Sequence, residues 1–165
     1  MLYPYIHYQQ TSCAQAIKNW ESKNNGVKAE DAIEIKLCCQ IPPIAKMDPK
    51  PLIALKNCEI LSLSTNTIDR MVSLSGMTKL RVLSLGRNNI KKLEKLDEVA
   101  SSLEQLWISY NQISSLDGIA SLVNLHTLYM SNNAIKSFGE LAYLVRLLVI
   151  TSVTIMKKYI RFLLK

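Results

Sequence analysis

The chain has 165 residues, 48% of them hydrophobic and 20% charged, which is typical of one globular domain and excludes a disordered or fibrous chain. Twenty lysines and arginines against thirteen acidic residues give a net charge of +7. Five of these basic residues and no acidic residue lie in residues 141–165, so the first 140 residues carry only +2. The basic balance is therefore not evidence for nucleic-acid binding, and five glycines are too few for a glycine-rich phosphate loop.

The chain begins with a lead over residues 1–11, MLYPYIHYQQT. It lacks a basic start followed by an apolar run, so we do not expect it to be a secretory signal. Ser12 and Gln15 have the spacing of a capping box, which predicts a helix from Cys13 onward. The Asn-Asn-Gly sequence at residues 24–26 predicts where this helix ends.

A second helix is predicted over residues 29–40, because Ile33 and Leu37 are four residues apart and would share one helix face. Prolines 42, 43, 49 and 51 then predict an irregular chain over residues 41–51. We therefore expect residues 12–56 to form a helical N-terminal cap and a proline-containing linker, which would cover the open end of the fold that follows.

The rest of the chain is dominated by an internal repeat with the frame L-x-x-L-x-L-x-x-N-x-I. Its four copies are CEILSLSTNTI from Cys58, LRVLSLGRNNI from Leu80, LEQLWISYNQI from Leu103 and LHTLYMSNNAI from Leu125. Their spacing of 22, 23 and 22 residues is that of leucine-rich repeats. Residues 57–140 are therefore predicted to form an α/β solenoid. Short parallel strands would line its concave face, and helical or 3₁₀ turns its convex side.

Two sets of side chains follow from this frame. The first is a ladder of asparagines whose amides would satisfy buried backbone groups as each strand turns inward: Asn66, Asn88, Asn111 and Asn133. The second is the set of large side chains on or beside the concave face, where most other residues are small: Arg87, Trp107, Tyr110 and Tyr129. Exposed tryptophan, tyrosine and arginine are typical of the centre of a protein interface, so this face is the predicted binding surface.

No enzyme is predicted. The concave positions contain no nucleophile paired with a base, no pair of carboxylates and no phosphate loop. The four cysteines form no C-x-x-C pair and have no histidines at zinc spacing, so we expect reduced thiols, no metal and no cofactor. Only Arg87 is charged among the concave positions, so we also expect no binding to nucleic acid.

Several stretches resemble one family closely, the axonemal dynein light chain 1 family of leucine-rich-repeat subunits of the outer dynein arm. They are IKNWESKN, EIKLCCQIPPIAKMD, NCEILSLSTNTI, LRVLSLGRNNIKKL, LEQLWISYNQI and LYMSNNAIK, within roughly residues 12–140. The resemblance implies a non-enzymatic regulator of ciliary and flagellar motility that binds the motor region of a dynein heavy chain and possibly tubulin. It also implies a cytoplasmic, cytoskeletal location in the axoneme of a cilium or flagellum. Arg87, Trp107, Tyr110 and Tyr129 would then lie on or beside the heavy-chain-binding face.

The chain departs from this family at both ends, in the lead and in residues 141–165. The latter, an apolar and basic segment, replaces the terminal repeat and helix that the family uses as its cap. Residues 141–156 could be read as a membrane anchor, but sixteen residues with Arg146 among them are too few to span a bilayer. The alternatives are therefore a general leucine-rich adaptor of another cytosolic complex and, less favoured, a repeat protein anchored at its C-terminal end.

Overall fold

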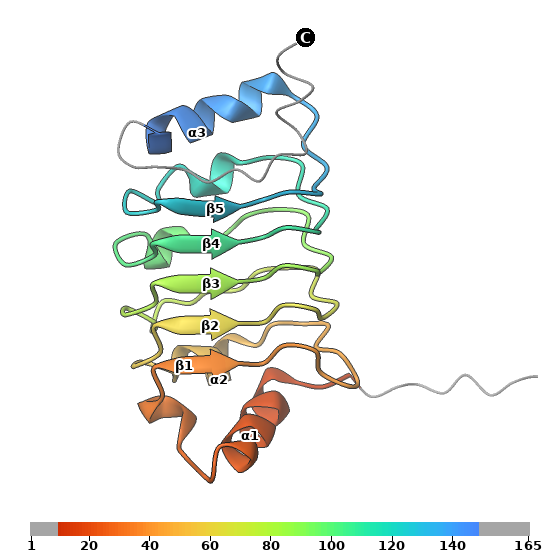
Figure 1. Cartoon of the computed structure of the whole chain (residues 1–165), viewed down its shortest axis with the longest axis vertical. Coiled ribbons are helices and arrows are strands. Elements are labelled where there is room, and N and C mark those ends of the chain that lie inside the picture. The colour runs from red at the N-terminus through yellow and green to blue at the C-terminus, as the bar shows by residue number, and fades with distance from the viewer. Residues whose placement is uncertain (1–9, 149–165) are drawn as a thin grey trace, which may run out of the picture.

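The computed structural model describes residues 10–148, and within this range the backbone forms a solenoid whose five strands stack in chain order (Figure 1). The strands are β1 (Glu34–Lys36), β2 (Ile60–Ser62), β3 (Val82–Ser84), β4 (Gln105–Trp107) and β5 (Thr127–Tyr129). Every neighbouring pair is parallel, and each strand lies beside the strand that follows it in the chain. This arrangement confirms the predicted leucine-rich-repeat solenoid.

The side of the solenoid opposite the sheet consists of short turns and helices. Its 3₁₀ helices are η1 (Ala29–Asp31), η2 (Asp97–Val99), η3 (Asp117–Ile119) and η4 (Phe138–Glu140), and the α-helices of the fold are α1 (Cys13–Lys23), α2 (Pro49–Ile53) and α3 (Leu141–Leu148). Figure 1 shows α1 next to β1 at one end of the stack and α3 beyond β5 at the other. The open ends of the repeat core are thus each covered by a helix.

The first helix follows its predicted start and stop. Ser12 is the N-cap of α1, and its hydroxyl accepts a hydrogen bond from the backbone N–H of Gln15 at 3.1 Å. This is one half of the predicted capping box, and the side-chain nitrogen of Gln15 donates along the helix to the side-chain oxygen of Asn19 at 2.9 Å. After the helix ends, Gly26 has φ +76°, and its backbone N–H donates a hydrogen bond to the carbonyl oxygen of Glu21 at 2.9 Å. One face of α1 buries Cys13 against the linker, where the backbone N–H of Asp48 donates to its sulfur.

The predicted helix over residues 29–40 is wrong. A single 3₁₀ turn is followed by β1, in which Ile35 is buried and its neighbours are exposed. This segment fits the repeat frame loosely, with Ile35 and Leu37 pointing into the core and Gln40 at the asparagine position. The segment forms a strand and not a helix because pairing with β2 satisfies its backbone hydrogen bonds. The strand also buries Ile35 and Leu37, which are two residues apart, in the common core.

The prediction that residues 41–51 are irregular is wrong at its end. Helix α2 begins at Pro49, and the carboxylate of Asp48 caps it by accepting from the N–H of Lys50 at 3.2 Å. Proline is tolerated in the first turn of a helix because no intrahelical acceptor is available there for its missing N–H. Leu52, on this short helix, is fully buried under the first repeats.

The asparagine positions join each repeat to the next through buried hydrogen bonds. Asn88 donates to the carbonyls of Leu63 at 3.1 Å and Leu85 at 3.0 Å, while its side-chain oxygen accepts from the N–H of Ile68 at 3.0 Å. Equivalent bonds are made by Asn66, Asn111 and Asn133. Each amide thus satisfies backbone groups of two repeats where no strand partner is available.

A second contact between repeats lies opposite the sheet, at glycines and glutamates that alternate along the chain and each directly precede an apolar residue: Gly76, Glu98, Gly118 and Glu140. At the glycines the backbones touch, since a Cβ on Gly118 would lie 2.0 Å from the carbonyl oxygen of Leu93. At the glutamates the side-chain carboxylate makes the contact with the preceding repeat. Glu98 accepts a hydrogen bond from the N–H of Leu74 at 2.8 Å, and Glu140 accepts one from the N–H of Leu116 at 2.6 Å. Neighbouring repeats are therefore held together on this side by backbone contacts at the glycines and by carboxylate hydrogen bonds at the glutamates.

The C-terminal helix α3 packs onto the last repeat through Leu144, which is buried against the core. None of the helices in the part of the chain that the structure describes is both long and apolar enough to cross a membrane. The segment considered as an anchor extends to residue 156, and its part beyond residue 148 lies outside the described residues. Most of the lead, residues 1–9, also lies outside them.

Candidate functional site

The exposed face of the sheet is the surface on which the predicted binding residues meet. In β2, β3 and β5 the central residue is buried and its two neighbours are half-exposed, so the outer side chains form rows across the strands. One row runs from Ser62 through Ser84 and Trp107 to Tyr129, as the strand register places them. The row therefore changes from small to aromatic side chains between β3 and β4.

Trp107 and Tyr129 form a pair of rings, here called the ring pair, at the end of this row. Their centroids are 5.3 Å apart and their planes meet at 83°, an edge-to-face contact. Such a contact is favourable beyond the burial of area and fixes the orientation of both rings. Trp107 remains 42% exposed, so the ring pair presents a rigid apolar surface to solvent.

Arg87 and Tyr110 form a second pair, here called the stacked pair, at the edge where the strands end. The guanidinium carbon of Arg87 lies 4.5 Å from the centroid of the Tyr110 ring, a cation–π contact. Both residues have left-handed backbones, with φ +56° and +60°. This conformation recurs directly before each asparagine position and is shared by Cys39, Thr65 and Asn132. It turns the chain inward, and Arg87 and Tyr110 themselves remain exposed.

Small residues surround these two pairs. Ser64 and Ser84 share a hydrogen bond of 2.6 Å between their hydroxyls, and Ser131 donates to Ser109 at 3.1 Å. Between them lies Gly86, where an added Cβ would come 3.3 Å from the carbonyl oxygen of Ser109. The hydroxyls bond one another, so a partner can approach the sheet here without leaving them unpaired.

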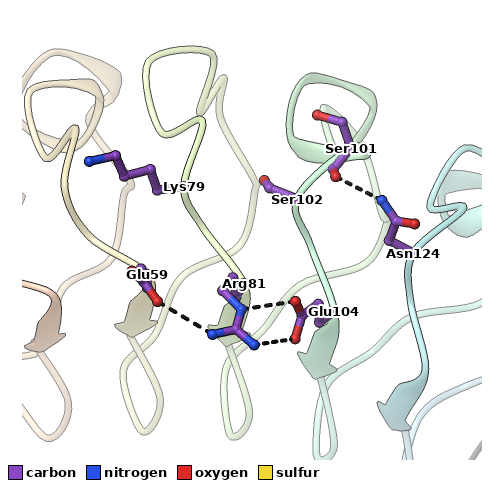
Figure 2. A pocket seen from close by; sticks show the side chains of 7 residues that line it. All are labelled: Glu59, Lys79, Arg81, Ser101, Ser102, Glu104 and Asn124. Atoms are coloured by element: carbon purple, nitrogen blue, oxygen red, sulfur yellow. Dashed lines mark hydrogen bonds and ion pairs between the residues drawn. The ribbon is translucent and has the colours of Figure 1, made fainter.

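A charged row at the opposite edge, where the strands begin, was missed by the sequence predictions. It consists of Glu59, Arg81, Glu104 and His126, and Figure 2 shows Arg81 reaching Glu59 and Glu104 on either side. Arg81 bonds Glu104 through two nitrogens at 2.8 and 2.9 Å and contacts Glu59 at 3.5 Å. The signal was present in the sequence, since all four residues directly follow the first frame position and alternate in sign along the first three.

These contacts favour the charged forms of Arg81 and Glu104. The hydrogen bonds from Arg81 hold the pKa of the Glu104 carboxyl below its ordinary value, and the same bonds raise the pKa of Arg81. The row flanks an open hollow of about 350 Å³ whose lining is polar: Glu59, Lys79, Arg81, Ser101, Ser102, Glu104 and Asn124 (Figure 2). Most of its polar groups already bond neighbours, as in the bond from Asn124 to the carbonyl oxygen of Ser101 at 2.7 Å.

Nothing in the described residues gathers into a reactive centre. Across residues 10–148 no three histidine, cysteine, aspartate or glutamate side chains come together in a way that could hold a metal ion. All four cysteines are free, and burial raises the pKa of Cys58 to about 11, so this thiol stays protonated and is a poor nucleophile. The ring pair and the stacked pair are therefore the features of this surface that we consider for binding.

Comparisons with known proteins agree with the repeat frame. A family defined as "Leucine Rich repeats (2 copies)" matches residues 101–143. Among solved structures, an internalin C2 from Listeria monocytogenes superposes with a TM-score of 0.54 at 30% sequence identity. That match covers 68% of this chain and 52% of the internalin.

Two curated relatives are more similar in sequence. Dynein axonemal light chain 1 of Danio rerio is 53% identical over 97 residues, which cover 59% of this chain and 50% of that protein. Its counterpart in Chlamydomonas reinhardtii is 55% identical over 99 residues, or 60% of this chain and 49% of the relative. The chain thus spans about half the length of the curated relatives it matches. It is a leucine-rich-repeat solenoid that, over more than half of its length, is similar to dynein axonemal light chain 1.

Proposed function

We propose that this chain is a non-enzymatic interaction subunit of the axonemal outer dynein arm, and that it binds the motor region of a dynein heavy chain through the exposed face of its sheet. It would act in the cytoskeleton of a cilium or flagellum, where it would regulate motility. The observation that carries the proposal is the exposed ring pair on a repeat scaffold that is 53–55% identical to dynein axonemal light chain 1.

The geometry of the ring pair supports a protein partner. The edge-to-face contact with Tyr129 holds the Trp107 ring in place, so little side-chain entropy remains to be lost when a partner covers it. Rigid, partly exposed tryptophan and tyrosine are the side chains that contribute most to protein interfaces, often 2 kcal/mol or more each, by the order of magnitude of alanine scans. The neighbouring serines and Gly86 leave room for the partner beside the rings.

The stacked pair adds a charge to this surface. Arg87 lies over Tyr110 and forms no ion pair with any residue in the described part of the chain. Its guanidinium N–H groups therefore remain available to a carboxylate of the partner, which would form charge-assisted hydrogen bonds with them. The surface thus fits a segment that places an apolar side chain against Trp107 and an acidic side chain near Arg87.

The direct test uses the full chain as bait for purified outer-arm heavy-chain motor fragments, with microtubule co-sedimentation as a separate assay for tubulin. We expect capture of a heavy-chain fragment by the unchanged chain and by an Arg81→Ala control at the other edge of the sheet. Trp107→Ala combined with Tyr129→Ala should lose it. If no outer-arm fragment is captured, the dynein proposal is wrong and the alternative of a general leucine-rich adaptor gains support.

A further inference from the structure

A row of three basic side chains lies beyond the turn at which the strands end. It consists of Lys46, Arg70 and Lys92, here called the basic row. Each of the three stands two residues after a buried isoleucine and directly before a buried methionine or leucine. The basic row therefore occupies one equivalent position in successive repeats, and all three of its side chains are exposed.

Hydrogen bonds between the repeats fix this register. The N–H of Thr67 donates to the carbonyl oxygen of Ile44 at 3.0 Å, and the N–H of Asn89 donates to that of Ile68 at 2.8 Å. The isoleucines that precede the basic row, Ile44, Ile68 and Ile90, each donate their own N–H to the side-chain oxygen of an asparagine in the next repeat at 3.0 Å. Parallel segments joined in this way lie about 4.8 Å apart, so the basic row extends over about 10 Å.

The charges of the basic row are not paired within the described part of the chain. None of its members forms an ion pair there, although Asp69 and Glu94 lie close to two of them in sequence. The next two repeats have Ser115 and Ser137 at the same position, so the row is confined to three neighbouring repeats. Three cations side by side repel one another, and an anionic partner would relieve this repulsion.

We propose that the basic row binds an acidic helix of a partner protein, with carboxylates along one helix face opposite Lys46, Arg70 and Lys92. Side chains three or four residues apart on a helix are about 5–6 Å apart, which matches the spacing between the repeats. One carboxylate in each turn of the helix can therefore form charge-assisted hydrogen bonds with one member of the row. The basic row is separate from the ring pair, so this binding does not depend on the proposed function.

The surroundings of the basic row favour a protein partner over a nucleic acid. Single-stranded nucleic acid is held by aromatic side chains that stack on its bases as well as by cations. The residues directly before and after each member of the row include no aromatic ring. Asp69 and Glu94 would also repel a phosphate backbone, which carries a charge at every residue, whereas a helix can place neutral side chains opposite them.

The test titrates the full chain at low salt with a synthetic alanine-based helical peptide that carries glutamate at every fourth position. Nuclear magnetic resonance should show shifts of the backbone N–H peaks around residues 46, 70 and 92. Combining Lys46→Gln, Arg70→Gln and Lys92→Gln should weaken binding about tenfold, because three exposed ion pairs are lost. The matched control changes three exposed lysines elsewhere to glutamine and should lose less than about threefold: Lys18, Lys28 and Lys56.

The two triple variants have the same net charge, and both should keep the Tm of the unchanged chain, since only exposed side chains are replaced. A second peptide, with the same glutamates spread around the helix, should bind at least about threefold more weakly than the first. Equal losses in the two variants, or equal binding of the two peptides, would overturn the proposal, because the attraction would then follow net charge alone. Tighter binding of a short single-stranded oligonucleotide, lost in the basic-row variant, would also overturn it, since the row would then be a nucleic-acid site.

Discussion

The arginines at the two edges of the sheet have different contacts. Where the strands begin, Arg81 is held between two carboxylates, with its closest contact to Glu104 at 2.8 Å. Where the strands end, Arg87 lies over the Tyr110 ring and forms no ion pair with another described residue. At one edge the arginine is paired with carboxylates of the chain itself, and at the other it has no carboxylate partner among the described residues. The difference teaches that exposed charge alone does not mark a binding surface, because internal pairing decides whether the charge is available.

The largest effect on folding should come from Asn111, the buried neighbour of the exposed Tyr110 at the strand-end edge. Asn111→Ala removes the hydrogen bonds to the carbonyls of Leu85 and Ile108 and the bond from the N–H of Ile90. We expect a loss of about 2–4 kcal/mol in unfolding free energy, because these buried groups are left without partners. This corresponds to a fall of about 6–12 °C in Tm, measurable by calorimetry.

The matched control is Gln112→Ala, an exposed amide one residue further along the chain. It should change the unfolding free energy by less than about 0.5 kcal/mol. Equal losses for the two variants would contradict the assignment of Asn111 to the joint between repeats.

A smaller effect, on binding and not on folding, is expected at Arg87. Arg87→Ala should weaken heavy-chain binding about tenfold, because both the charge and the stack on Tyr110 are lost. Arg87→Lys keeps the charge without the planar stacking group and should recover only part of the affinity. Isothermal titration at two salt concentrations checks this, and the deficit of Arg87→Ala should shrink at high salt. An unchanged affinity would show that the strand-end edge is not part of the interface.

At the opposite edge, Arg81→Ala should lower Tm by no more than about 2 °C, since exposed ion pairs contribute little to stability. The same variant should bind a heavy-chain fragment with an affinity within about twofold of the unchanged chain. A loss of binding as large as that of Arg87→Ala would remove the distinction between the two edges.

The smallest effect concerns the pH dependence at Glu104. Its pKa is lower in the folded chain than its ordinary value, because Arg81 donates hydrogen bonds to the charged carboxylate. The folded state is therefore stabilised above the ordinary glutamate pKa of about 4.3, and this contribution disappears as the pH falls through the lower folded value. Glu104→Gln should lose a small part of the stability at neutral pH and match the unchanged chain at low pH. Urea unfolding at pH 7 and at acid pH measures this, and a difference that grows on acidification would have the wrong sign.

The repeats could be predicted because the leucine frame records burial directly. Leu83 and Leu85 are buried and alternate with half-exposed neighbours, and the next repeat has the same pattern. The strand β1 could not be separated from a helix, since Ile33 and Leu37 suit a helix face while Ile35 and Leu37 suit a strand. Residue 40, at the asparagine position of the frame, is a glutamine, so the segment was not recognised as a further repeat. Pairing with β2 decided between them, and that contact is not visible in a local stretch of sequence.

The surface was predictable only in part. Alternation along the strands was enough to predict that Trp107 and Tyr129 lie side by side, because equivalent positions of neighbouring strands must be adjacent. The charged row was missed because it occupies a frame position that accepts many residue types, and the alternation of glycine with glutamate was missed because it lies outside the regular part of the frame. What singles them out is the contact with the neighbouring repeat, as in the bond of Glu98 to Leu74.

The central claim is that the ring pair forms the binding surface and the charged row does not. The most direct measurement is the affinity of the full chain for a purified outer-arm heavy-chain motor fragment, compared between Trp107→Ala with Tyr129→Ala and the Arg81→Ala control. We predict that the double variant binds at least about 100-fold more weakly, since two interface rings together contribute roughly 3 kcal/mol or more. The control should keep its affinity. An unchanged affinity of the double variant, in a chain whose Tm shows that it is folded, would contradict the claim.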